Sequence, residues 1–96
     1  KGARGALEKA ARLSPRYAPA WRWLGECERG ELRWTQAERC FSRAIALDFR
    51  SAAAYAGRGE CRLRLGQKAE ASADLNFALG LRPDFEEARR LRDSIG

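Results

Sequence analysis

The chain has 96 residues, enough for one small domain, and carries a formal net charge of +6 with 33% charged and 45% apolar residues. Valine is absent, isoleucine is rare, and alanine, leucine, arginine and glutamate dominate, so the composition favours helices over strands. The 3 cysteines lack the spacing of a metal motif or a disulfide framework, and histidine is absent. We therefore expect no metal site and no cofactor.

Six helices are expected from the positions of the helix breakers. In chain order they cover residues 2–13, 18–31, 34–47, 52–65, 68–81 and 85–95. Pro15 and Pro19 separate the first two, because proline disfavours helical backbone in the residue before it. Gly66 ends the fourth helix, where glycine adopts a left-handed backbone at little cost. Asp84, followed three residues later by Glu87, predicts a capping box at the start of the sixth helix.

A step of 34 residues relates the second and third helices to the fourth and fifth. Gly25-Glu26-Cys27 recurs as Gly59-Glu60-Cys61. The same step matches apolar or small residues with residues of similar kind, as in Trp21 with Tyr55, Ala37 with Ala71, Phe41 with Leu75, and Ala44 with Ala78. A catalytic site would not require a copied apolar framework. The repeat therefore predicts stacked helix pairs, each burying surface that its neighbour cannot bury alone.

The repeated positions resemble the tetratricopeptide repeat (TPR), whose signature places an aromatic residue, a Leu-Gly pair, small residues, a large apolar residue and a proline at fixed positions. The first unit carries Trp21, Leu24, Gly25, Ala37, Phe41 and Ala44, and the second carries Tyr55, Gly59, Ala71, Leu75, Ala78 and Pro83. Arg58 departs from the leucine position, Glu28 and Arg62 from the later aromatic position, and Phe49 from the proline position.

The resemblance implies an all-α fold, a right-handed superhelical stack of antiparallel helix hairpins, or α-solenoid. Residues 1–96 would form one domain: 1–15 the second half of a preceding repeat, 18–51 and 52–85 two repeats, and 86–96 a terminal capping helix. Four large residues are expected to fill the seam between paired helices: Phe41, Leu47, Leu75 and Leu81. Cys27 and Cys61 are expected to be packing residues, and Cys40 to pack or be partly exposed.

The resemblance also implies a groove lined by the first helix of each pair. The residues expected to contact a partner there are Arg22, Trp23, Glu26, Arg29, Glu60, Arg64 and Arg90. The arginines suit carboxylates of a peptide, so an acidic segment is a candidate partner. One alternative remains, in which these charges form solvated ion pairs with one another. Arg22 and Glu26 are four residues apart, and so are Glu60 and Arg64.

Trp23 has two interpretations. It could anchor a partner in the groove, or it could cover Gly57 of the next helix pair. Some TPR domains clamp the terminal carboxylate of chaperone tails with lysine and asparagine. The matching positions here hold Arg22, Glu26 and Gly57, so binding of that kind is not expected.

The function expected from this pattern is a protein–protein interaction module that binds a peptide or helical segment without catalysis. No phosphate loop or plausible pair of catalytic acids accompanies the missing histidine. A basic helical repeat that binds nucleic acid is one alternative, although glutamates interrupt the groove. Self-association into a homo-oligomer through an apolar seam at Leu7, Ala10 and Leu13 is another. No membrane span or signal pattern is present, and a cytoplasmic location is expected.

Overall fold

The structure, a computed structural model, describes residues 2–95, with side chains from Arg4 to Ile95. Six helices follow one another: α1 (Gly2–Leu13), α2 (Ala18–Gly30), α3 (Trp34–Leu47), α4 (Ala52–Arg64), α5 (Lys68–Leu81) and α6 (Glu86–Asp93). The described residues contain no strand, and the all-α prediction is confirmed. The expected helices differ only at the ends of α2, α4 and α6. Lys1 and Gly96, which the expected domain boundaries include, lie outside the described residues.

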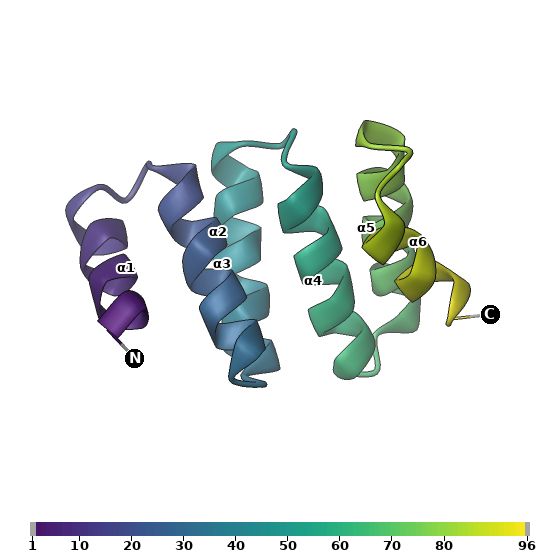
Figure 1. Ribbon diagram of the computed structural model, residues 1–96, viewed down its shortest axis with the longest axis horizontal. Coiled ribbons are helices and arrows are strands. Elements are labelled where there is room, and N and C mark those ends of the chain that lie inside the picture. The colour runs from purple at the N-terminus through teal and green to yellow at the C-terminus, as the bar shows by residue number, and fades with distance from the viewer. Residues whose placement is uncertain (1, 96) are drawn as a thin grey trace.

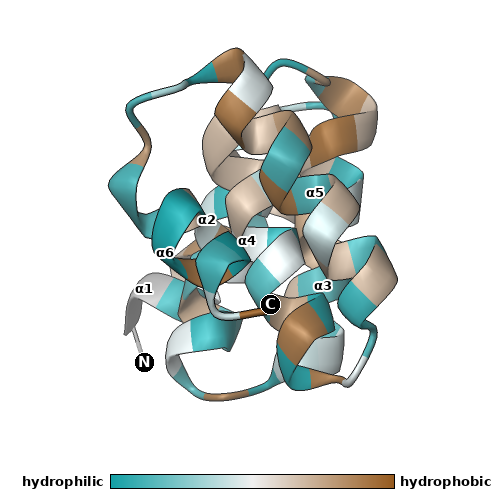
Figure 2. Ribbon diagram, turned by 90° about the vertical axis from the view of Figure 1, so that its right-hand side faces the viewer, coloured by the Kyte–Doolittle hydropathy of each residue, from teal (hydrophilic) through white to brown (hydrophobic). Residues whose placement is uncertain are grey.

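The helices form two layers along an elongated molecule of 40 × 24 × 19 Å. Helices α2 and α3 form one antiparallel hairpin, and α4 and α5 form the next (Figure 1). The first helices of the pairs lie side by side, because α4 contacts both α2 and α6. Figure 1 shows α2, α4 and α6 in the near layer and α3 and α5 behind them. Figure 2, seen from the C-terminal end, shows that α6 is mostly hydrophilic. No helix in residues 2–95 is long and apolar enough to cross a membrane.

The ends of α2 and α4 share one turn geometry. Gly66 has φ +84°, as predicted, and Leu32, 34 residues earlier, has φ +61°. After each of these residues, a backbone N–H bonds a carbonyl in the last turn: Arg33 donates to Glu28 at 2.9 Å, and Gln67 donates to Arg62 at 2.8 Å. Leu32 therefore adopts a backbone conformation that costs a non-glycine residue about 1–2 kcal/mol.

The starts of the helices are capped differently from the expectation. Ser51 accepts a hydrogen bond from the Ala54 N–H at 3.2 Å and caps α4. The capping box predicted at Asp84 is wrong, because Phe85 holds the cap position of α6 without a side-chain hydrogen bond. The chain thus enters α6 one residue later than a capping aspartate would require.

Phe41 is the central core residue and is fully buried between two glycines. A Cβ atom would stand 3.0 Å from its ring at Gly25 and only 2.5 Å from it at Gly57. In the second hairpin, Leu75 covers Gly59, where a Cβ would stand 2.9 Å away. The glycines therefore set how closely the helices approach.

Two of the four expected seam residues do not fill the core. Leu47 and Leu81 are each 39% exposed, whereas Phe41 and Leu75 are fully buried. Both exposed leucines are the last residues of their helices, α3 and α5, where the partner helix no longer covers them. The core is instead continued by small residues, among them Ala44.

The cysteines are free thiols in different surroundings. Cys61 is fully buried, so its predicted packing role is confirmed, and Cys40 is buried as well. Cys27 is only partly buried, which departs from the expected equivalence with Cys61. Burial raises the pKa of Cys61 to about 12 and that of Cys40 to about 11, so both stay neutral near pH 7.

Candidate functional site

Arg29 joins the three helices of one layer. Its guanidinium pairs with Glu26 on α2, with Glu60 on α4 at 2.5 Å, and with Glu87 on α6 at 3.4 Å. Burial lowers the pKa of Arg29, but the hydrogen bonds and charges of Glu60 and Glu26 outweigh burial, and the pKa is raised. A permanently charged group is thus fixed at the centre of this surface.

An open hollow of about 600 Å³ lies beside this ion cluster. Glu26, Arg29, Gly30, Leu32, Trp34, Glu60 and Arg64 line it, and we call these residues the inner surface. The Arg64 guanidinium lies 5.7 Å from the centre of the Trp34 ring and 3.7 Å from a Glu60 carboxylate oxygen. Leu32 is 68% exposed. The inner surface therefore combines a charged floor with an apolar wall.

Four of the seven residues expected to contact a partner meet on the inner surface: Glu26, Arg29, Glu60 and Arg64. The alternative ion pair of Glu60 with Arg64 is present, whereas Glu26 pairs with Arg29 instead of Arg22. Arg90 is exposed on α6, the helix that also supplies Glu87 to the cluster.

Arg22 and Trp23 lie away from this hollow. Arg22 lines a small crevice with residues such as Ala44 and Asp48, and its guanidinium stands 5.7 Å from the Trp23 ring. Trp23 is 43% exposed. The Phe41 ring fills the space that a side chain at Gly57 would take, and the interpretation that Trp23 covers Gly57 stays a prediction.

The sequence interpretation missed Leu32 and Trp34. Trp34 is the first residue of α3 and lies outside the repeat signature, so no motif pointed to it. Leu32 had a signal, since the 34-residue step places it opposite Gly66. A leucine at a position that needs a left-handed backbone indicates a role that outweighs its strain.

The inner surface is suited to binding through charge-assisted hydrogen bonds and apolar contact. Within residues 2–95, no group of three or more histidine, cysteine, aspartate or glutamate side chains is placed to hold a metal ion. The carboxylates of the cluster are instead directed at Arg29 and Arg64.

Comparison with known proteins identifies the fold. No protein-family model and no curated protein matches the sequence. Among solved structures, an Arabidopsis OM64 TPR domain superposes with a TM-score of 0.93 at 25% identity, over 96% of this chain and 76% of that one. This chain has the TPR fold.

Two other structures with this fold contain peptides. The second TPR domain of human RPAP3, in complex with the HSP70 peptide SGPTIEEVD, has a TM-score of 0.91 at 24% identity, over 96% of this chain and 77% of that one. The Yersinia enterocolitica secretion chaperone SycD, in complex with a peptide of the translocator YopD, has a TM-score of 0.86 at 21% identity, over 96% of this chain and 76% of that one.

Proposed function

We propose that this chain is a protein–protein interaction module that binds a peptide or helical segment of a partner on its inner surface, without catalysis. One observation carries the proposal: Arg29 connects α2, α4 and α6 beside an apolar wall formed by Trp34 and Leu32. The peptides held by TPR domains of RPAP3 and SycD support it by analogy of fold. We also propose a cytoplasmic setting for this interaction.

The charges suggest how a peptide would lie. Arg29 is already surrounded by three carboxylates, so it has little capacity left for a further one. Peptide carboxylates would therefore reach Arg64 and Arg90, which are exposed. The glutamates would accept hydrogen bonds from peptide N–H groups. We propose Arg22 and Trp23 as additional contacts beyond the hollow.

Leu32 provides independent support. It is exposed although apolar, and it keeps a strained backbone that glycine would adopt freely. Replacing Leu32 with glycine should stabilise the fold by up to about 1 kcal/mol and weaken peptide binding. A purely structural residue would not give these opposite effects.

The test starts from a displayed library of linear peptides selected against the folded domain. The tightest peptide is labelled, and its affinity is measured by fluorescence anisotropy for wild type, Arg64→Ala and Leu32→Gly. Arg64→Ala should weaken binding about tenfold, as expected for a central contact. Arg82→Ala is the control, because it removes the same charge from an exposed position, 58% accessible, outside the hollow. Failure to select any peptide, or equal affinity for all variants, would contradict the proposal.

A chaperone-tail peptide gives a sharper prediction about specificity. The HSP70 peptide SGPTIEEVD should bind this chain no better than a scrambled peptide of the same composition. The expected clamp positions hold Arg22, Glu26 and Gly57; Glu26 adds negative charge, and Gly57 lies under the Phe41 ring. Anisotropy measured with both labelled peptides checks this. Clear preference for the native tail would mean that the clamp has been rebuilt from other residues.

A further inference from the structure

A second hollow surface lies between α1 and α3. Its floor is Trp21 and Leu24 of α2, and its walls carry Arg12 from α1 and Arg39 and Arg43 from α3; we call it the outer groove. Two adjoining hollows of about 490 and 410 Å³ make up the groove and share Trp21 and Arg43. None of these residues belongs to the inner surface.

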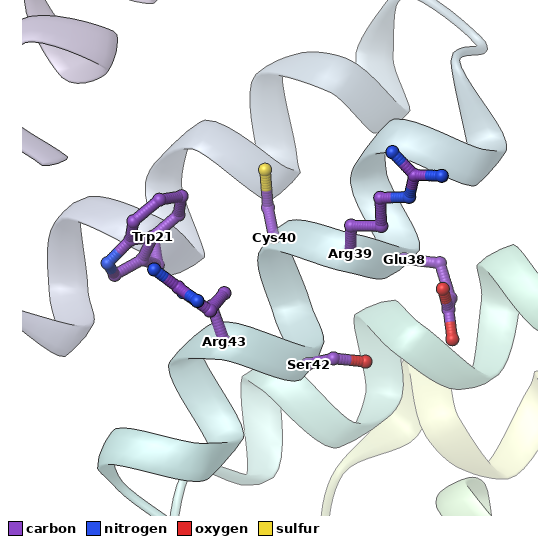
Figure 3. A pocket seen from close by; sticks show the side chains of 6 residues that line it. All are labelled: Trp21, Glu38, Arg39, Cys40, Ser42 and Arg43. Atoms are coloured by element: carbon purple, nitrogen blue, oxygen red, sulfur yellow. The ribbon is translucent and has the colours of Figure 1, made fainter. Parts of the chain in front are cut away.

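The indole at the floor of the outer groove is held in place. Trp21 Nε1 donates a hydrogen bond to the Pro15 carbonyl at 2.9 Å. The Arg43 guanidinium lies 4.9 Å from the centre of the Trp21 ring. Figure 3 shows Arg43 reaching toward Trp21, while Glu38 lies on the other side of α3. The indole therefore lies close to the positive charge of Arg43, and the buried Cys40 lines the same hollow.

The outer groove has an excess of positive charge. Arg12, Arg39 and Arg43 are exposed and make no ion pair with any other described residue, and the same holds for Arg16 at the end of the groove. The two carboxylates that line the groove are paired with other arginines. Glu8 pairs with Arg4 at 3.6 Å, and Glu38 pairs with Arg62 at 3.2 Å. Four guanidiniums therefore remain available to an anionic partner.

The equivalent surface of the second hairpin lacks the unpaired arginines of the groove walls. Phe77 stands where Arg43 stands in the first hairpin, and its ring lies 4.4 Å from that of Tyr55, the counterpart of Trp21. The 34-residue step also replaces Arg12 with Ala46 and Arg39 with Ala73. The fold does not require these arginines, because alanine or an aromatic residue stands at each of the equivalent positions 34 residues later.

We propose that the outer groove binds an acidic amphipathic helix of a partner protein. An apolar side chain of that helix would lie against Trp21, and its carboxylates would pair with the flanking arginines. Arg39 and Arg43 are one helical turn apart, a rise of about 6 Å, which matches carboxylates at positions i and i+4 of a partner helix. The apolar floor and the Glu8 carboxylate at the rim favour this partner over a nucleic-acid chain, which presents a phosphate at every step.

The test uses a designed helical peptide of about four turns, with leucines on one face and glutamates flanking them. A matched peptide carries glutamine in place of every glutamate. Binding is measured by anisotropy, and the position by the indole N–H signals of Trp21 and Trp34 in nitrogen–proton NMR spectra. The acidic peptide should shift the Trp21 signal and leave Trp34 unchanged, since the two indoles lie on different surfaces. The glutamine peptide should bind at least about tenfold more weakly.

Two variants connect binding to the groove. Arg43→Phe installs the residue found in the second hairpin, and it should close the groove over Trp21 and reduce affinity at least about tenfold. Arg39→Ala should weaken binding about threefold or more. Arg82→Ala is the control; its side chain is 58% exposed near the start of α6, and the variant loses the same charge. Far-ultraviolet circular dichroism confirms that each variant keeps its helices.

Several results would overturn the proposal. Equal binding of the acidic and glutamine peptides would remove the role of the arginines. A shift of Trp34 alone would place the peptide on the inner surface. A single-stranded RNA oligonucleotide that binds more tightly than the acidic peptide and shifts Trp21 would assign the groove to nucleic acid. Concentration-dependent dimerisation that Arg43→Phe abolishes would assign it to a second copy of this chain.

Discussion

The two interfaces between consecutive helix hairpins hold the same ion pair with opposite signs. At the first, Arg4 of α1 lies 3.5 Å from Glu28 of α2; at the second, Glu38 of α3 lies 3.2 Å from Arg62 of α4. The 34-residue step maps Arg4 onto Glu38 and Glu28 onto Arg62. The fold therefore fixes the place of the pair and leaves its polarity free. Because of the reversal, stacking α1 against α4 would bring two arginines together, so the charges favour the native order of the hairpins.

The interiors of the two hairpins also differ, here in whether equivalent positions hold apolar or charged residues. The first has Leu24 and Cys40, two buried apolar residues. The second has Arg58 and Asp74 at these positions, joined by two hydrogen bonds of 2.8 and 2.9 Å. Arg62 adds a third bond to Asp74 at 3.1 Å. The same backbone thus accommodates an apolar contact or a nearly buried ion network.

The largest loss of stability is expected when Phe41, the core residue that contacts both hairpins, is truncated. Phe41→Ala should reduce the free energy of unfolding by about 4 kcal/mol, because the ring fills the space between two glycines and its removal leaves a cavity. Leu75→Ala, at the equivalent position, should cost about 3 kcal/mol, since the lost side chain is smaller. Urea unfolding followed by circular dichroism measures both. A cost below about 1 kcal/mol for Phe41→Ala would contradict the observed packing.

A smaller loss of stability is expected when the ion network inside the second hairpin is broken. Asp74→Ala should cost about 2–3 kcal/mol because it leaves Arg58 and Arg62 without their shared carboxylate; their partial exposure of 17% and 21% keeps the cost below that of a fully buried pair. The double variant Arg58→Leu with Asp74→Cys copies the first hairpin. It should regain most of the lost stability, because a packed apolar pair needs no desolvation of charge. If the double variant is less stable than Asp74→Ala, the two interiors are not interchangeable.

The reversed ion pairs give a third, weaker effect. Glu28→Arg should destabilise the fold by about 1–2 kcal/mol, since it places a second positive charge near Arg4. Adding Arg4→Glu restores the pair with the polarity of the second interface and should recover about 1 kcal/mol in a double-mutant cycle. The matched cycle uses Glu38→Arg with Arg62→Glu. If the stability changes of the single variants add exactly in both cycles, the polarity of the ion pair does not contribute to the stability of the helix stack.

The smallest effect per residue is the contribution of the two buried cysteines to stability, and it depends on pH. The raised pKa values of Cys61 and Cys40, about 12 and 11, mean that the folded protein keeps these protons when an unfolded thiol, with its ordinary pKa of 9.0, has lost them. This contribution is nearly complete below pH 9 and is lost as pH rises toward the folded values, by about 1.3 kcal/mol per thiol between pH 8 and 10.

Urea unfolding at pH 8 and pH 10 measures this loss, and the variant Cys40→Ala with Cys61→Ala serves as its control. Thiol labelling of the folded protein gives a parallel readout, in which Cys27 should react first. Rapid labelling of Cys61 would contradict its burial.

The 34-residue step predicts which positions of the apolar framework are equivalent, but it does not fix which of them face the core, since Leu47 and Leu81 are both 39% exposed. Phe41 and Leu75 are buried as expected. Polar interactions between hairpins were not predicted, since Arg4 and Glu28 are 24 residues apart and meet only when α1 packs on α2.

The composition of the inner surface was predicted in part. Glu26, Arg29, Glu60 and Arg64 follow from helical spacing, which is a local property. Leu32 lies in the turn between α2 and α3, and a turn has no periodicity that would show which way its side chain points. Trp34 is the first residue of α3 and lies outside the repeat signature, so the repeat did not predict its direction either. The outer groove was not predicted, because the sequence shows Arg43 and Phe77 at one repeat position but does not show that Arg43 lies over Trp21 while Phe77 packs against Tyr55.

The most direct test of peptide binding on the inner surface is an NMR titration of the indole N–H signals with the peptide selected from the library. We predict that Trp34 shifts progressively and saturates at the peptide concentration given by anisotropy, while Trp21 stays in place. The same titration of Arg64→Ala should need about ten times more peptide. Saturable binding that leaves Trp34 unmoved would show that the peptide lies elsewhere and would contradict the proposed function.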